Sequence, residues 1–159
     1  MADKATGSMS ASVFQDEIKA TMSGSSAYEP KDSNDKWLFA EVAVSNSSAD
    51  LIADMDYLGT ATTTVVADDD VAWIAIKNIS STSTDGVGIR IDAGTAAYNS
   101  AGNIYIGSGE MVVLKTYTTP LASIHAISVT MDGTYGYPSA THAGTVSCQI
   151  AAIVDDGGV

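Results

Sequence analysis

The sequence has very little of three things that narrow a protein's function: cysteine, basic side chains and long apolar runs. Its single cysteine, Cys148, excludes an intrachain disulfide bond and is consistent with folding in a reducing cytoplasm. No run approaches the roughly 18 apolar residues that a membrane-spanning helix needs. Residues 1–10 also lack the pattern of a secretory signal. We therefore expect a soluble protein without a membrane partner.

Basic residues are scarce: seven Lys and Arg stand against 19 Asp and Glu, for a net charge of −12. Proteins that bind DNA or RNA use Lys and Arg to displace counterions from phosphates. From Trp37 onward the chain has three basic and 13 acidic residues, so this part would repel nucleic acid. We expect no nucleic-acid partner. The acidity could serve solubility alone or form a specific interaction face, and both interpretations stay open.

The Leu, Glu, Lys and Gln that favour surface helices are also scarce, whereas Ala, Ser, Thr and Gly provide 72 of the 159 residues. Eight short runs have the composition and alternation of strands, and turn signals such as Gly107-Ser-Gly109 and Asp132-Gly133 separate them. This pattern predicts an all-β fold, an antiparallel β-sandwich with jelly-roll connectivity. The expected strands are 37–44, 60–66, 71–79, 87–92, 104–106, 110–116, 122–131 and 145–154.

Residues 1–36 differ from the rest and are expected to form an N-terminal arm, with the β-sandwich domain spanning 37–159. Ser12 and Gln15 have the spacing of a capping box, which predicts a short helix near 13–21. The helix would have one thin apolar stripe and would need a partner surface to be stable. We expect the arm to bind a partner through Val13, Phe14 and Ile18; a disordered leader is the alternative.

Residues with catalytic or metal-binding chemistry do not form a recognisable motif. Cys148 lies on the expected inward face of the last strand, together with Val146 and Ile150, so we expect it to pack in the core. His125 and His142 lack zinc-site spacing. Residues 68–70 are three consecutive aspartates, which could hold calcium or simply be solvated. We expect no catalytic residue, no metal site and no cofactor.

The loop from Gly133 to Pro138 carries two tyrosines, Tyr135 and Tyr137, in a stretch rich in glycine. Exposed aromatic rings on loops often contact a protein partner or stack on a sugar. We therefore expect Tyr135 and Tyr137 to bind a partner or ligand. In the alternative interpretation, both rings pack back onto the end of the sandwich.

Three segments of the second half have a characteristic order: Val87-Gly-Ile-Arg-Ile-Asp92, then Ile104-Tyr-Ile-Gly-Ser-Gly-Glu-Met-Val-Val-Leu114, then Ile124-His-Ala-Ile-Ser-Val129. This order resembles β-sandwich structural proteins of tailed bacteriophages, among them capsid decoration (cement) proteins; tail and neck components are also similar. The resemblance implies a protein made in the host cytoplasm that lies on the capsid surface of the virion. It also implies binding to the major capsid protein, bridging of capsomers and self-association, often as a homotrimer. No site residue carries over from the family.

Three functions from different classes therefore remain open. The first is capsid decoration by a structural protein. The second is a carbohydrate- or receptor-binding jelly-roll module of a virion or bacterial surface, with Tyr135 and Tyr137 at its site. The third is a hydrolase, for which the sequence offers His125, His142 and scattered acids. We expect a protein that is not an enzyme.

Overall fold

The computed structural model describes most of the chain. The described residues are 4–15, 18–30, 35–53, 55–58, 65, 69–91, 96–99, 102–116, 119–120 and 124–155, and the side chains of 12–15, 18–21 and 119–120 are not among them. Every regular element in this part is a β-strand. No helix long and apolar enough to cross a membrane occurs in it.

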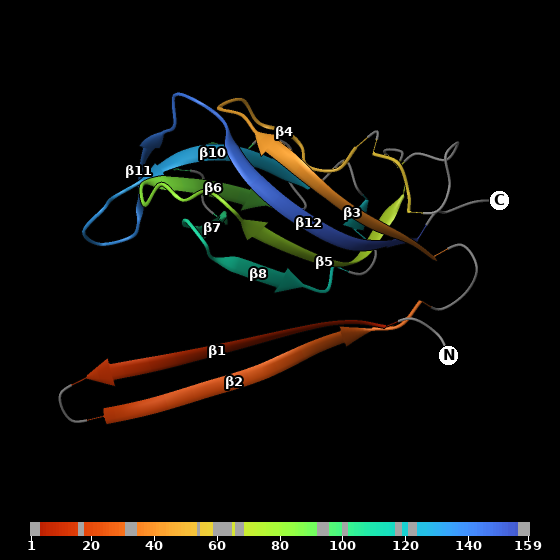
Figure 1. Cartoon of the computed structure of the whole chain (residues 1–159), viewed down its shortest axis with the longest axis horizontal. Coiled ribbons are helices and arrows are strands. Elements are labelled where there is room, and N and C mark those ends of the chain that lie inside the picture. The colour runs from red at the N-terminus through yellow and green to blue at the C-terminus, as the bar shows by residue number, and fades with distance from the viewer. Residues whose placement is uncertain are drawn as a thin grey trace.

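Two antiparallel sheets pack against each other as a β-sandwich (Figure 1). The first sheet has the order β3-β12-β5-β8, with β9 beside β5. The second has the order β11-β10-β6-β7, with β4 beside β10. The first sheet consists of β3 (Asp35–Val44), β5 (Asp70–Asn78), β8 (Met111–Leu114), β9 (Thr119–Pro120) and β12 (Val146–Asp155). The second consists of β4 (Ala49–Asp50), β6 (Asp85–Arg90), β7 (Ile104–Ile106), β10 (His125–Met131) and β11 (Pro138–Thr141).

Strand alternation builds the core between the sheets. Along β12 every second residue faces inward, and the expected inward set is fully or almost fully buried. Ile74 and Ile76 of β5 and Val87 and Ile89 of β6 meet that set from the neighbouring strands and are each 0% exposed. Burial of such side chains contributes about 1.5–3 kcal/mol each, so this layer is what holds the two sheets together. The inward residues of β12 are Val146, Cys148, Ile150, Ala152 and Val154.

The prediction of an all-β antiparallel sandwich is confirmed, and seven of the eight expected strands overlap observed ones. The eighth, 60–66, lies outside the described residues except for Val65, which is buried but not in a strand. Sequence patterns did not predict the short strands β4, β9 and β11. Each forms only because a longer strand offers it a hydrogen-bonding edge.

The predicted helix near 13–21 is wrong. Residues 13–15 and 18–21 instead lie in a β-hairpin formed by β1 (Ala5–Gln15) and β2 (Ile18–Tyr28), which pair along their whole length from Ala5↔Tyr28 to Gln15↔Ile18. The capping-box spacing was outweighed by period-two alternation, in which small apolar residues alternate with Ser and Thr. Such a sequence gives a ribbon with one apolar face, whereas a helix would mix both residue types on every side.

The base of the hairpin packs on the outer face of the first sheet. Ala5 is only 5% exposed and lies in one cluster with Trp73 of β5 and Ile153 of β12. A Cβ atom added to Gly7 would lie 2.7 Å from Cγ2 of Val113 on β8, so the ribbon backbone lies directly on that side chain. Glycine permits this close approach because it has no side chain to displace the ribbon. We call this contact the hairpin base.

We expect Ile76→Ala to lower the free energy of unfolding by about 2–5 kcal/mol, because it leaves a cavity beneath a fully buried side chain. Lys77→Ala is the matched control, since the neighbouring side chain is exposed and points to the other face. Chemical denaturation monitored by tryptophan fluorescence measures both. Equal losses of stability would show that the inward face of β5 has been misassigned.

Candidate functional site

The β1–β2 hairpin has two chemically different faces. Residues paired across an antiparallel ladder lie on the same face, so Met9 lies with Gly24, and Ala11 with Met22. Ala5, whose side chain is buried at the hairpin base, is on this same face. The opposite face carries Thr6 and the serines 8, 10, 23 and 25. The hairpin is therefore an amphipathic ribbon.

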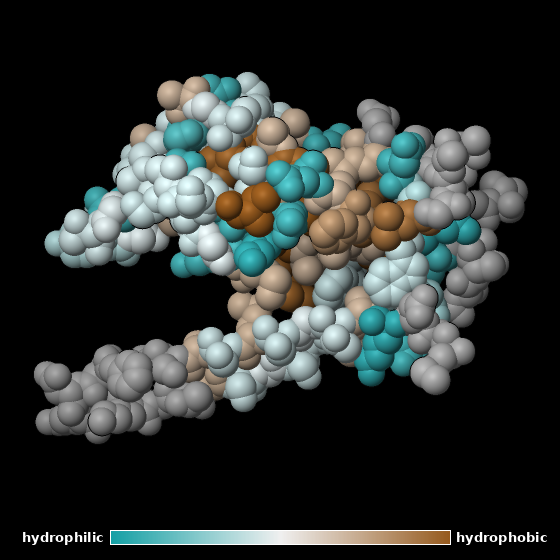
Figure 2. All heavy atoms as spheres, viewed as in Figure 1, coloured by the Kyte–Doolittle hydropathy of each residue, from teal (hydrophilic) through white to brown (hydrophobic). Residues whose placement is uncertain are grey.

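Beyond its base, the apolar face of this ribbon exposes two methionines. Met9 is 51% exposed and Met22 is 62% exposed. Figure 1 shows β1 and β2 diverging from the sandwich, and in Figure 2 open space separates the described part of the hairpin from the sandwich beyond the base. The sequence-predicted residues Val13, Phe14 and Ile18 lie in the strand parts farthest from the base, and their side chains lie outside the described residues. Their role in binding a partner stays a prediction.

A second apolar surface adjoins the hairpin base on the outer face of the first sheet. It is a shallow hollow of about 140 Å³. Phe39 on β3 is 58% exposed and Met111 on β8 is 39% exposed at its rim. Ala75 and Ala151 belong both to this hollow and to the cluster under the hairpin, so the two surfaces are continuous. We call it the outer-sheet hollow; Lys77, Gln149 and Ile150 complete its lining.

The outer face of the other sheet is better covered. Ile127, Val129 and Met131 of β10 are buried beneath a cluster that includes Ala96, Tyr98 and Tyr105. The Tyr105 hydroxyl donates a hydrogen bond of 2.6 Å to the carbonyl oxygen of Tyr98, which fixes this cover. Of the two outer sheet faces, that of the first sheet is therefore the less covered among the described residues.

The loop between β10 and β11 presents the two predicted tyrosines to solvent. Tyr135 is 77% exposed and Tyr137 is 53% exposed, and their rings are nearly parallel, with centroids 6.1 Å apart and planes 14° apart. Oδ1 of Asp132 accepts hydrogen bonds from the backbone N–H groups of Thr134 and Tyr135. Gly136 has a φ of 68°, which favours glycine, and donates to the Asp132 carbonyl. The alternative that both rings pack onto the sandwich is therefore wrong.

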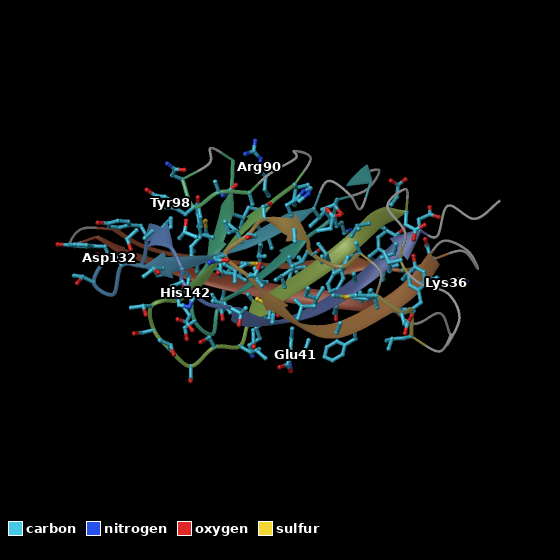
Figure 3. All side chains as sticks on the ribbon, turned by 90° about the horizontal axis from the view of Figure 1, so that it is seen from above. Lys36, Glu41, Arg90, Tyr98, Asp132 and His142 are labelled. Carbon is cyan, nitrogen blue, oxygen red and sulfur yellow. The ribbon has the colours of Figure 1, made fainter. Side chains whose placement is uncertain are left out.

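The hairpin and the tyrosine loop extend toward the same end of the molecule. Figure 1 shows the far end of β1 and β2 and the β10–β11 loop on one side, away from the start of β1 and the end of β12. Figure 3, from above, places Asp132 of that loop at the same end as the ribbon. Two groups of candidate partner-binding residues that are far apart in sequence thus lie on one end of the protein.

Cys148 lies in the core, as predicted. It is 0% exposed, and burial raises the pKa of its thiol from 9.0 to about 12 because the charged thiolate would lose its hydration. A thiol of this kind is a poor nucleophile, since the thiolate is the reactive form.

Both histidines contact a carboxylate. Nε2 of His125 lies 3.0 Å from Oδ1 of Asp50, which joins β10 to the short strand β4. Nε2 of His142 lies 4.0 Å from Oδ1 of Asp85. Asp50 lies on β4, which pairs with β10, whereas Asp85 begins β6 and His142 directly follows β11.

The aspartate run 68–70 is divided by the fold. Asp69 is buried and its Oδ2 accepts a hydrogen bond of 2.6 Å from the Tyr57 hydroxyl, while Asp70 begins β5 and Asp68 lies outside the described residues. In the part of the chain that the structure describes, no three His, Cys, Asp or Glu side chains gather as a metal-binding group. Asp69 is thus buried as the acceptor of the Tyr57 hydrogen bond, apart from Asp70 on the strand.

Comparison with protein-family models, curated proteins and solved structures found no match.

Sequence reasoning identified the tyrosine loop but missed the apolar ribbon face and the outer-sheet hollow. The period-two pattern of residues 5–15 and 18–28 could have indicated the ribbon. Alanine and glycine dominate its apolar face, so its hydrophobic signal is weak. The hollow had no comparable signal, because β5 is apolar on both faces and only the fold shows which face is covered.

We expect Cys148 to react very slowly with a maleimide in the native protein at mildly alkaline pH and rapidly after unfolding. Burial keeps the thiol neutral below its raised pKa, and the pKa returns toward 9.0 when the chain unfolds. Mass spectrometry of labelled samples measures the two rates. Fast labelling under native conditions would contradict the packing of β12.

Proposed function

We propose that this chain is a virion structural protein that decorates a phage capsid and stabilises it by bridging neighbouring capsomers. The β-sandwich is the rigid body, and the hairpin is the arm that reaches the neighbouring protein. Its partners are the major capsid protein and further copies of itself. The proposal needs neither a cofactor nor catalysis, since the work is adhesion.

This proposal rests mainly on one observation: two sets of predicted contact residues lie at the same end of the protein. Val13, Phe14 and Ile18 lie in the far part of the hairpin strands, and Tyr135 and Tyr137 lie on the loop at that end. A rigid loop with exposed aromatic rings costs little conformational entropy on binding. Contacts from two separate elements also fix the orientation of the body on a shell.

The strand order supports a jelly-roll assignment, which fits the proposal. The chain passes from β3 in the first sheet to β4 in the second, then to β5 in the first and β6–β7 in the second. It then returns to β8, crosses to β10–β11, and ends in β12 of the first sheet between β3 and β5. Jelly rolls of eight strands occur in viral capsid proteins and in lectins.

The charge distribution also suits this role. β1 and β2 contain one charged residue, Lys19, whereas the chain from Trp37 onward has a net charge of −10 from three basic and 13 acidic residues. A nearly neutral arm can approach another protein without repulsion, while an acidic body remains hydrated on the particle surface. Many copies bound in symmetric positions would convert a modest affinity into strong reinforcement.

We expect Phe14→Ala combined with Tyr135→Ala to weaken binding to undecorated capsids of the phage that encodes the chain. Loss of one well-packed aromatic contact typically costs more than 2 kcal/mol of binding free energy at a hot spot. Co-sedimentation with capsids measures the affinity. Leu58→Ala is the control, because the Leu58 side chain is 55% exposed but lies on neither the hairpin nor the tyrosine loop; its backbone N–H donates to the carbonyl oxygen of Trp37. Unchanged binding of the double variant would refute the assigned docking end.

The parallel tyrosines favour one alternative, a carbohydrate-binding module. Aromatic faces held on an ordered loop can stack on the apolar face of a sugar ring. Asp132 orders this loop, and Thr134, which precedes Tyr135, is exposed. With a net charge of −12, the protein would favour neutral over acidic sugars.

We expect this alternative to be decided by a glycan array followed by titration calorimetry. If it holds, Tyr135→Ala abolishes binding of a neutral glycan, because the most exposed ring is removed, while Tyr137→Phe retains most of it. Binding of the intact protein to capsids without any glycan signal would exclude the module and leave decoration as the function.

A further inference from the structure

The large apolar side chains left exposed by the fold are not scattered. The structure describes seven such residues, and four of them belong to the two surfaces that meet at the hairpin base. Met9 and Met22 lie on the apolar face of the ribbon, and Phe39 and Met111 lie at the outer-sheet hollow. Exposed apolar patches of this kind commonly mark an interaction surface.

These two surfaces already fit each other within one molecule. At the hairpin base, Ala5 of the ribbon packs against Trp73 and Ile153, and the Gly7 backbone lies on Val113. The same ribbon face continues through Met9 and Met22, and the same sheet face continues into the hollow through Ala75 and Ala151. The contact at the base thus covers only the first part of the two surfaces. Beyond the base the hairpin diverges from the sandwich (Figure 2), so the two surfaces do not meet there.

Charge favours a second copy as the occupant. The lining of the hollow contains one charged side chain, Lys77, and no carboxylate. The two residues between β1 and β2 in the sequence are acidic, Asp16 and Glu17, and the strands add only Lys19. The segment 5–28 thus has a net charge of −1, which is opposite in sign to the charge of Lys77, so two chains that each carry −12 can meet where the hollow contributes no carboxylate.

We propose that the hairpin of one copy lays its apolar face on the outer-sheet hollow of a second copy. Met22 and Met9 of the first copy pack against Phe39 and Met111 of the second. Both halves of the interface lie on the same chain, so the contact can be exchanged reciprocally in a dimer or passed round a ring. The proposal concerns association of the chain with itself and does not depend on capsid binding.

The test uses the full chain and two single variants, Met22→Asp on the ribbon and Phe39→Asp at the hollow. Both side chains are more than half exposed, so both variants should fold, and thermal unfolding checks this. Sedimentation velocity over a concentration series measures association. We expect the wild-type chain to associate and each variant to dissociate at concentrations at least about tenfold higher than the wild type. Met9→Asp replaces Met22→Asp if the latter fails to fold.

Complementation distinguishes this contact from any other arrangement. In an equimolar mixture of the two variants, the intact ribbon of Phe39→Asp can still bind the intact hollow of Met22→Asp. We therefore expect the mixture to form a one-to-one complex at a concentration where each variant alone is monomeric. Leu58→Asp is the matched control and should associate as the wild type does, because this exposed side chain belongs to neither surface.

Three results would overturn the proposal. The wild-type chain could remain monomeric over the whole series, in which case the hairpin has no second copy as partner. The two variants could stay monomeric when mixed, which would show that the ribbon of one copy does not bind the hollow of another. Leu58→Asp could dissociate as readily as Met22→Asp, which would place the interface elsewhere. None of these measurements involves a capsid, so their results do not test capsid decoration.

Discussion

A two-stranded ribbon with one apolar face is only marginally stable in water, and this constraint governs the whole structure. The ribbon formed by β1 and β2 satisfies it at one end, where Ala5 and Gly7 rest on Trp73, Ile153 and Val113. Farther along, Met9 and Met22 are each more than half exposed. The fold thus leaves a strand pair that gains stability when another protein surface binds its apolar face, which is the physical basis of an adhesive arm.

The sandwich makes such an arm possible because it supplies a rigid anchor. Its core joins β12 and β5 to β6 through fully buried side chains, including Ile150, Ile76 and Ile89. The same strands turn their other residues outward, and this outer face receives the hairpin base. A single sheet therefore holds the core on one side and the arm on the other. The tyrosine loop, fixed by Asp132, extends from the second sheet toward the same end as the arm.

The sandwich was predictable from the sequence because its strands combine strong alternation with clear turn residues. The last strand is the best case: Val146, Cys148 and Ile150 were assigned to the core and are buried. The N-terminal strands were not predictable in the same way, since alanine, glycine and serine contribute little to a hydrophobic pattern. A spacing shared by Ser12 and Gln15 then favoured a helix that the chain does not form. Period-two alternation, which lets β1 and β2 pair along their whole length, outweighed that spacing.

Of the candidate site, the sequence predicted the exposed tyrosines but not the hollow beside Phe39. Glycine-rich loops with aromatic residues are local features, so the sequence alone is enough to identify them. The hollow depends on which apolar strand face the rest of the chain leaves uncovered, and that is a property of the packing. Ala75 illustrates this, because it lies on a strand that is apolar on both sides and contacts both the hairpin cluster and the hollow.

The most direct measurement of the central claim is hydrogen–deuterium exchange of the β1 and β2 amides at increasing protein concentration. If the ribbon needs a second molecule for cover, amides around Met9 and Met22 should exchange rapidly in dilute protein and slow markedly as concentration rises. Amides of β12 should remain protected throughout. Hairpin amides that are as protected as those of β12 even at the lowest concentration would contradict the account, because the arm would then be stable without a partner.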